Sequence, residues 1–504
     1  MSERETLALT PSRAKRGRFG RGLLVAGGLL AGGLAVLAGC APNPATGKQD
    51  FTLFMSPGEE SRIGAEQHTQ IVRQYGGVYA DPEIGGYVAE IGGRLAANSE
   101  RPDIRFTFTV LDSPVVNAFA LPGGYVYVTR GLVALANSEA ELAGVIGHEI
   151  GHVVARHSAQ RYSQAVAAQL GATILGAAIG NSAVNQLFET GASLYLLSFS
   201  RDQEFEADQL GIRYLTRAGY EPAAEAQFLQ SLIYEKELDE KINSANGRQP
   251  RAEFLQTHPN TPDRVQAAIQ AVGGAPRGLP TLRDEFLKRV DGMIYGDSPA
   301  HGFVRGQRFV HPELRFAFEV PQGFRLANFP TRVAARGPQE SLIIFDDAGP
   351  KTHPDIRTYL TSIWAANLSL EGVERIDING LRAVTGRTRV NTQKGEMDLR
   401  LVAIQFGPNK IYRLRYLSPP ALTARLASDF QRSTYSFRGL SPAEAQGFRP
   451  YRLRVHTVQS SDTIDGLAAR LPYADFKIDR FRALNGMGPT DRLAVGGQVK
   501  VVVE

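Results

Sequence analysis

The chain has 504 residues, 43% of them hydrophobic and 21% charged, and it carries a formal net charge of +5. This length predicts several domains, and this composition allows large hydrophobic cores. The first 39 residues hold six Lys or Arg and two Glu, so +4 of the net charge belongs to this leader. The nearly neutral remainder gives no sign of a nucleic-acid partner.

Residues 1–39 have the features of a targeting segment. Five basic residues lie between positions 13 and 21, and the apolar run 22–38 follows them. This run is too short and too rich in glycine to predict a membrane-spanning helix. We therefore expect a signal peptide.

The leader ends in Leu-Ala-Gly-Cys at residues 37–40, which resembles the lipobox of bacterial lipoproteins. Cys40 is the only cysteine of the chain, so an internal disulfide is excluded. We expect lipidation of Cys40 and a tether over residues 40–55, and Ala41 favours the outer membrane of a Gram-negative cell. The alternative is a plain signal peptide or anchor with a chance cysteine.

Capping signals predict helices that begin at Ser56-Pro57 and at Asp81-Pro82, because each pair is a cap followed by proline at the first helical position. Residues 104–110 alternate like a strand. Two further extended stretches, 115–120 and 125–129, are separated by a Leu-Pro-Gly-Gly break.

The next feature is the motif His-Glu-Ile-Gly-His, which begins at His148. Ser138 and Glu141 have the spacing of a capping box and predict the start of the helix that carries it. His148 and His152 are four residues apart, so they project from one face and can bind one ion at about 2.0–2.1 Å. Glu149 then lies beside a water at the metal rather than on the metal, which is the position of a general base.

A third ligand is predicted at Glu204. Two histidines and one glutamate form a catalytic zinc set with an open fourth position, so we expect one zinc ion per chain. Asp208 lies four residues further on and would accept the second N–H of a zinc-bound histidine. Glu206 is predicted to lie on a solvated helix face, and His157 to be structural rather than a ligand.

Residues 165–180 are almost all small or apolar, but they are fewer than the roughly 20 residues that span a bilayer. One interpretation is a helix over the cleft in contact with lipid or substrate, and the other is a buried helix hairpin. Residues 201–217 and 222–241 are predicted to be helices.

His258 lies in a loop that Pro259 and Pro262 keep out of the neighbouring helices. It is the remaining histidine of this region that a loop could bring to the metal, as a fourth ligand or latch. The alternative is a histidine that caps a helix. Arg264 is a candidate oxyanion stabiliser if it lies near the cleft, and a surface arginine is the alternative.

Four motifs in this order resemble those of the HtpX-like and BepA-like zinc metallopeptidases, a family related to the CAAX prenyl proteases. The motifs are residues 117–124, 148–152, 204–208 and 257–259, and the resembling region is residues 56–272. The resemblance implies a mainly helical zincin-type peptidase domain with a small edge-strand sheet above the zinc.

For the site, the resemblance implies that His148, His152 and Glu204 are the zinc ligands and Glu149 the general base. It also implies that His258 can occupy the fourth zinc position and exclude water. The edge strand would align an extended substrate by strand addition, and an ordinary hairpin is the alternative.

Residues 273–301 are predicted to be a linker with a helix over 282–295. Residues 302–440 are predicted to form a small α+β domain without a chemical motif. Its expected strands are 316–321, 341–345, 399–404 and 411–416, and its expected helices are 358–366 and 422–433.

Residues 450–504 resemble a LysM module, a type of domain that binds peptidoglycan glycans. Residues 455–464 match its opening strand and helix cap, and residues 484–486 and 493–501 match its later turn and closing strand. The turn at 460–462 departs from the usual glycine-aspartate sequence, which leaves glycan binding open.

The sequence thus predicts an α+β multidomain protein, a zinc endopeptidase that is lipid-anchored at the periplasmic face of the outer membrane. By resemblance, its substrates are misfolded or unassembled envelope proteins. The alternative is a peptidoglycan-associated chaperone or assembly factor with a latent or structural zinc site. An open fourth position beside Glu149 favours the enzyme, and a closed site that includes His258 favours the alternative or a latent enzyme.

Overall fold

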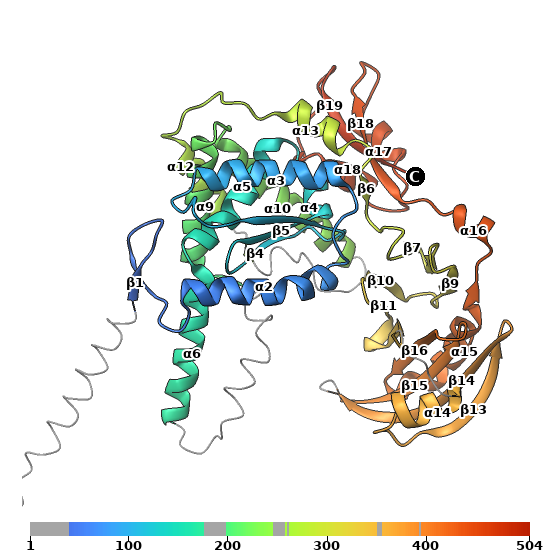
Figure 1. Cartoon of the computed structure of the whole chain (residues 1–504). Helices are drawn as coiled ribbons and strands as arrows, with labels where there is room; N and C mark the ends of the chain where they lie inside the picture. Colours follow the sequence, from blue (N-terminus) through green and yellow to red (C-terminus); the bar gives the residue numbers. More distant parts are fainter. Residues whose placement is uncertain (1–39, 176–197, 245–257, 260–261, 350–354, 393–394) are drawn as a thin grey trace, which may run out of the picture.

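A computed structural model describes residues 40–175, 198–244, 258–259, 262–349, 355–392 and 395–504. The predicted leader and the end of the apolar stretch 165–180 lie outside these residues. Figure 1 shows a helical body, a sheet-rich domain below it to one side, and the C-terminal module against the upper part of the body. Among the described helices, none is both long and apolar enough to cross a bilayer.

The helical body surrounds a three-stranded sheet of order β3-β5-β4, in which β3 is parallel and β4 antiparallel to β5. The strands of this body, with the N-terminal hairpin, are β1 (Cys40–Pro42), β2 (Gln49–Phe51), β3 (Thr107–Leu111), β4 (Ala118–Leu121) and β5 (Tyr125–Thr129). The helices are α2 (Pro57–Gln74), α3 (Pro82–Ala97), α4 (Arg130–Leu135), α5 (Glu139–Val154), α6 (His157–Leu175), α9 (Arg201–Arg217), α10 (Ala223–Ser244), α12 (Pro262–Val272) and α13 (Arg283–Val290).

Local capping explains where these helices begin. Ser56 and Asp81 cap α2 and α3, as predicted. Ser138 caps α5 by accepting the N–H of Glu141, but the Glu141 carboxylate accepts the N–H of Asn137 instead of that of Ser138. Only half of the predicted capping box therefore forms, yet the helix begins where the sequence placed it.

The sheet is buried on both faces, and its period of two decides which residue faces which helix. Tyr127 of β5 packs in a cluster with residues of α2. Its neighbours Val126 and Val128 are turned away from that cluster, and Val128 belongs to the main core with α3 and α5. Strand β4 is left at the edge of the sheet, next to α5. The helix with the predicted metal motif thus runs beside an edge strand.

The predicted linker is packed rather than free. Phe286, Leu287 and Val290 of α13 are fully buried in the main core. The short strand β6 (Ile294–Tyr295) pairs with the C-terminal module. The predicted helix over residues 282–295 is too long, because α13 ends at Val290 and residues 294–295 form a strand.

The C-terminal module has the order strand, helix, helix, strand, and its apolar residues belong to the same core as the helical body. Its elements are β18 (Tyr451–Thr457), α17 (Ile464–Ala469), α18 (Lys477–Leu484) and β19 (Gln498–Val503), with the sheet order β19-β18-β6. Leu453 and Phe481 are 0% exposed in that shared core. The module therefore shares one hydrophobic core with the helical body.

Lys500 of β19 ties the module to that body. It is fully buried, and its Nζ donates to the carbonyl oxygens of Ala134, Leu135 and Ala136 at 2.6, 3.0 and 2.6 Å, at the C-terminal end of α4. Lys500→Met leaves these carbonyls without a donor, so we expect a loss of about 2–4 kcal/mol of unfolding free energy, measured by urea denaturation. The exposed Lys288→Met is the control and should shift it by less than about 0.5 kcal/mol. An equal effect of both changes contradicts the prediction.

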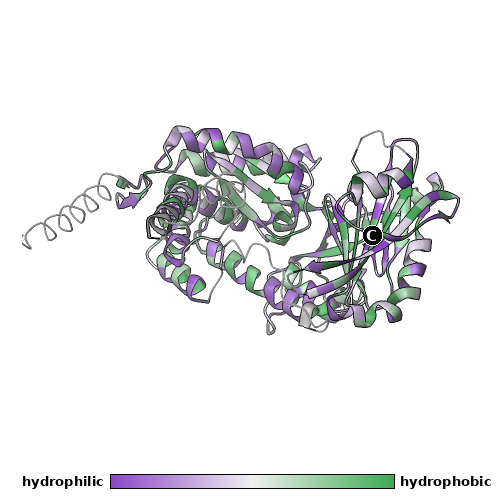
Figure 2. Ribbon diagram, turned by 90° about the horizontal axis from the view of Figure 1, so that it is seen from below, coloured by the Kyte–Doolittle hydropathy of each residue, from purple (hydrophilic) through white to green (hydrophobic). Residues whose placement is uncertain are grey.

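The domain of residues 302–440 has two antiparallel sheets and one long helix, which agrees with the predicted α+β class. One sheet has the order β17-β9-β8-β7, with β7 (Phe303–Arg305), β8 (Arg308–His311), β9 (Phe316–Glu319) and β17 (Arg438–Gly439). The other has the order β10-β11-β12-β16-β15-β14-β13, with β10 (Arg325–Phe329), β11 (Arg332–Arg336), β12 (Leu342–Asp347), β13 (Glu371–Ile378), β14 (Leu381–Thr392), β15 (Gly395–Gln405) and β16 (Ile411–Ser418). The helical segments are η1 (Pro338–Glu340), α14 (Ile356–Thr358), the π-helical η2 (Tyr359–Trp364), α15 (Pro420–Ser436) and, just after the domain, α16 (Pro442–Gln446). Figure 2 shows this domain beside the helical body, with hydrophobic and hydrophilic residues intermixed along its strands.

Candidate metal centre

Helices α5 and α9 cross at backbone contact, and this crossing assembles the site. A Cβ on Gly211 of α9 would lie only 3.1 Å from the backbone N of His148, and a Cβ on Gly147 would lie 3.3 Å from the Cα of Gly211. Larger residues would force the two helices apart. The glycines therefore bring Glu204, in the first turn of α9, to the two motif histidines of α5.

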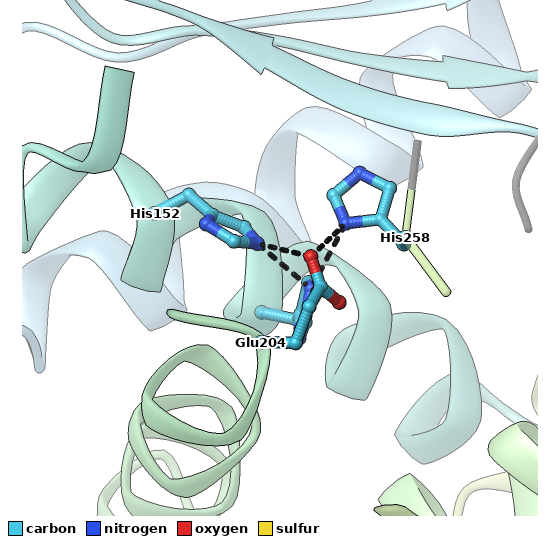
Figure 3. A group of neighbouring side chains, drawn as sticks. His152, Glu204 and His258 are labelled. Atoms are coloured by element: carbon cyan, nitrogen blue, oxygen red, sulfur yellow. Dashed lines mark hydrogen bonds and ion pairs between the residues drawn. The ribbon is translucent and has the colours of Figure 1, made fainter. Parts of the chain in front are cut away.

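Four buried side chains, those of His148, His152, Glu204 and His258, converge at this crossing. In Figure 3 the labelled His152, Glu204 and His258 point toward one another. The His148 Nε2 lies 3.0 Å from the His152 Nε2 and 3.3 Å from the His258 Nδ1. The Glu204 Oε1 lies 3.0 Å from the His258 Nδ1 and 3.5 Å from the His152 Nε2.

These distances match a tetrahedron. Two corners of a tetrahedron whose centre-to-corner bonds are about 2.0–2.1 Å are about 3.3–3.4 Å apart, and zinc binds imidazole at that bond length. The second carboxylate oxygen of Glu204, Oε2, lies 3.6 Å from the His148 Nε2. The composition and the spacing of the four donors therefore both fit a zinc ion.

Glu149 gives an independent test of the fit. It is 0% exposed, and neither carboxylate oxygen accepts a hydrogen bond from the residues that the structure describes. The His258 Nε2 is 3.5 Å from its Oε1. Burial raises the pKa of Glu149. A buried carboxylate without donors is costly, and a water at the metal would supply the missing O–H donor once His258 leaves the fourth corner.

The outer nitrogen of His148 is held by Asp208. The His148 Nδ1 lies 2.9 Å from the Asp208 Oδ1, which leaves Nε2 for the metal. Burial opposes the charge of His148, but the hydrogen bond to Asp208 and the charge of Glu204 outweigh it and raise the pKa of His148 to about 9. The structure thus places Asp208 beside the outer nitrogen of His148.

Arg264 lies in the first turn of α12 and is 1% exposed, so the alternative of a surface arginine is wrong. Its Nε and Nη2 donate to the two oxygens of Asp208 at 2.8 and 2.6 Å, and its Nη1 lies 2.7 Å from the Glu204 Oε2. Burial disfavours the charged form of Asp208, but Arg264 outweighs it and holds the pKa of Asp208 below its usual range. These contacts favour a positioning role for Arg264 over the predicted oxyanion role.

The prediction that Glu206 lies on a solvated helix face is wrong. Its Oε2 lies 3.5 Å from the Nε2 of His157, whose Nδ1 is 2.8 Å from the Nδ1 of His152. On a continuous helix a spacing of five turns a side chain by about 140°, which is why the sequence excluded His157 from the site. Arg156, however, lies between α5 and α6 with a φ of 56°, so that His157 turns back toward His152.

The group formed by His148, His152, Glu204 and His258, called the metal group below, lies beside a cleft of ≈ 490 Å³. This cleft is lined by His152 and Arg156 at the end of α5, by Leu121 at the end of the edge strand β4, and by Glu60 of α2. An extended chain in the cleft would meet both the outer edge of β4, which pairs with no further strand among the described residues, and the metal group.

A buried His, His and Glu group, beside a buried glutamate that accepts no hydrogen bond from the described residues and at the side of an edge strand, defines the metallopeptidase class of site. The family model described as "Peptidase family M48" matches residues 83–272. The "Mitochondrial metalloendopeptidase OMA1" of Schizosaccharomyces pombe is 30% identical over 259 residues, which cover 50% of this chain and 72% of that protein.

Two bacterial relatives are also similar to the chain. The "Putative beta-barrel assembly-enhancing protease" of Vibrio cholerae is 32% identical over 41% of this chain and 43% of that protein. The "Beta-barrel assembly-enhancing protease" of Escherichia coli K12 is 31% identical over 42% of this chain and 44% of that protein. The chain thus spans less than half the length of these two relatives. On these matches, the chain belongs to peptidase family M48.

Proposed function

We propose that the protein is a zinc endopeptidase of the bacterial cell envelope that acts on misfolded or unassembled envelope proteins. The observation that carries the proposal is the tetrahedral spacing of the four buried donors beside the carboxylate of Glu149, which accepts no hydrogen bond from the described residues. Membership in family M48 supports the peptidase activity. The names of the two bacterial relatives, beta-barrel assembly-enhancing proteases, support substrates that belong to envelope assembly.

Zinc, when bound, would polarise a peptide carbonyl and lower the pKa of water. Glu149 would take the proton from the attacking water and return it to the leaving amine. Asp208 fixes the ring of His148, and Arg264 holds Asp208 and Glu204 in place. The free edge of β4 would align the substrate backbone through strand addition.

The same proposal includes a closed resting state. The His258 Nδ1 lies with the other three donors, at the corner that a water would need. A site closed in this way belongs to a latent enzyme or to the alternative function, a peptidoglycan-associated chaperone or assembly factor with a structural zinc. Glu149 favours the latent enzyme, because a structural site needs no buried carboxylate without a hydrogen-bond donor beside it.

Removal of the metal tests the proposed function. We expect purified wild-type protein and His258→Ala each to contain one zinc per chain. Chelation should abolish casein hydrolysis by His258→Ala, and added zinc should restore it, because Glu149 has no base function without the metal-activated water. A zinc-loaded His258→Ala protein that hydrolyses no casein would favour the chaperone or assembly factor.

A lipid anchor at Cys40 is the second part of the proposal, and the lipobox-like residues 37–40 support it. Cys40 should be the first residue of the mature chain and carry more than one acyl chain, since a single chain binds a membrane only marginally. Mass spectrometry of the mature N-terminus measures this. Cys40→Ser should leave the membrane fraction. An unmodified Cys40, or a Cys40→Ser protein that stays on membranes, contradicts the prediction.

We further propose that this anchor holds the protein at the periplasmic face of the outer membrane. The module of residues 450–504 would then contact peptidoglycan, which its resemblance to LysM supports.

A further inference from the structure

The two motif histidines differ in what holds their outer nitrogens. The ring of His148 contacts a carboxylate directly, at Asp208. The ring of His152 contacts a second imidazole instead, because its Nδ1 lies 2.8 Å from the Nδ1 of His157. Both histidines of this second pair are buried, at 2% and 0% exposure, so solvent does not compete for the bond.

The contact between the rings of His152 and His157 determines which ring nitrogens carry hydrogen. If the His152 Nε2 binds the metal, its Nδ1 carries the hydrogen and donates it to the His157 Nδ1. The His157 hydrogen then lies on Nε2, which faces the Glu206 Oε2 at 3.5 Å. Glu206 is therefore the negative end of a relay that runs through two imidazole rings to the metal.

The N-terminal hairpin holds Glu206 in this position. Asn43 is 3% exposed, and its Nδ2 donates to the Glu206 Oε1 at 3.0 Å and to the Asp50 Oδ2 at 2.8 Å. Asn43 belongs to the segment between β1 and β2.

This hairpin is packed on the helical body, whereas the sequence predicted a tether. The Gln160 Nε2 of α6 donates to the Asp50 Oδ2 at 2.8 Å, and the backbone N–H of Phe54 donates to the Ser163 Oγ at 3.1 Å. Asn43 follows Cys40 by three residues. The predicted anchor point is therefore joined to the metal group by one short path of polar contacts.

We propose that His157 and Glu206 are positioning residues for the ligand His152, and that the hairpin of residues 40–51 holds Glu206 in place for this role. This inference rests on the proposed zinc site. The chain of polar contacts that starts at His148 ends inside the helical body, at Arg264. The chain of contacts that starts at His152 ends on the N-terminal hairpin. Displacement of the hairpin therefore weakens metal binding at His152 without touching a ligand.

Two substitutions at His157 separate a relay from simple packing. Asn places an amide oxygen near the position of Nδ1 and still accepts from His152, whereas Leu fills the space and accepts nothing. The relay predicts that His157→Leu loses about 10- to 100-fold in zinc affinity and that His157→Asn keeps most of it. Packing alone predicts the opposite order, because Asn would be a buried polar group in place of an apolar one. The readout is the zinc dissociation constant of the purified full-length protein, by competition with a chromogenic chelator.

Substitutions at Glu206 and Asn43 test the outer part of the path. Glu206→Ala should lose about 10-fold or more in zinc affinity, and Asn43→Ala should lose several-fold. The control is Asp202→Asn, which removes the same charge from an exposed position of the same helix and should leave the affinity unchanged. Melting of the zinc-free proteins shows that each variant is folded.

The outcomes distinguish this inference from the proposed function. A wild-type protein that binds no zinc overturns both. A wild-type protein that binds zinc, with Glu206→Ala and His157→Leu binding it equally tightly, overturns the relay alone. Loss of affinity in these two variants, with His157→Asn and Asp202→Asn close to wild type, supports it.

Discussion

Glu149→Gln should lower casein hydrolysis by about 10²–10⁴-fold and leave the zinc content at one ion per chain. The substitution keeps the shape of the side chain and removes only its ability to take a proton. Glu149 is not one of the four converging donors, so the metal group stays intact. Casein hydrolysis and metal analysis on the purified proteins measure the two effects, and His258→Ala is the background in which hydrolysis is easiest to detect.

Glu204→Ala is the matched comparison, because it removes a carboxylate from the donor group itself. This variant should lose both zinc and hydrolysis, whereas Glu149→Gln loses hydrolysis alone. The assignment of a base and a ligand fails if Glu149→Gln loses its zinc, or if the protein is fully active without Glu204.

His258→Ala should raise casein hydrolysis and self-cleavage at neutral pH, with zinc retained by His148, His152 and Glu204. The reason is that His258 fills the fourth corner of the donor group, where its Nδ1 lies 3.0 Å from Glu204 and 3.3 Å from His148. If His258 favours the closed over the open site by about 1.4 kcal/mol, its removal raises the active fraction roughly tenfold. The increase grows tenfold with each further 1.4 kcal/mol.

His68→Ala is the control for this second prediction. His68 is another histidine of the same domain, but its Nδ1 contacts the hydroxyl of Tyr127, outside the donor group. Its substitution should leave hydrolysis at the wild-type rate. Unchanged hydrolysis by His258→Ala, together with a water in the fourth position of a wild-type crystal structure, would rule out the latch.

The features that the sequence predicted best are those whose causes are local. Ser56 and Asp81 cap α2 and α3 because each bonds to a backbone N–H three residues ahead. The spacing of His148 and His152 and that of Glu204 and Asp208 follow from the helical period alone. Residues 201–217 form α9 with the predicted limits.

The features that the sequence missed depend on contacts between distant segments. Glu206 was assigned to solvent because its own helix gave no sign that Asn43, 163 positions earlier, would cover it. His157 was set aside because the left-handed Arg156 between the helices α5 and α6 could not be foreseen. Likewise, Lys500 is buried against α4 across 366 positions of sequence, so the C-terminal module was predicted as a separate unit.

The central claim is one zinc ion in the group formed by His148, His152, Glu204 and His258. Anomalous diffraction at the zinc edge, from crystals of the wild-type protein, tests it most directly. The account predicts a single peak about 2.0–2.1 Å from the Nε2 atoms of His148 and His152, with the Glu204 carboxylate and the His258 Nδ1 at the two remaining corners. A peak bound by other residues, or no peak in a zinc-saturated crystal, contradicts the account.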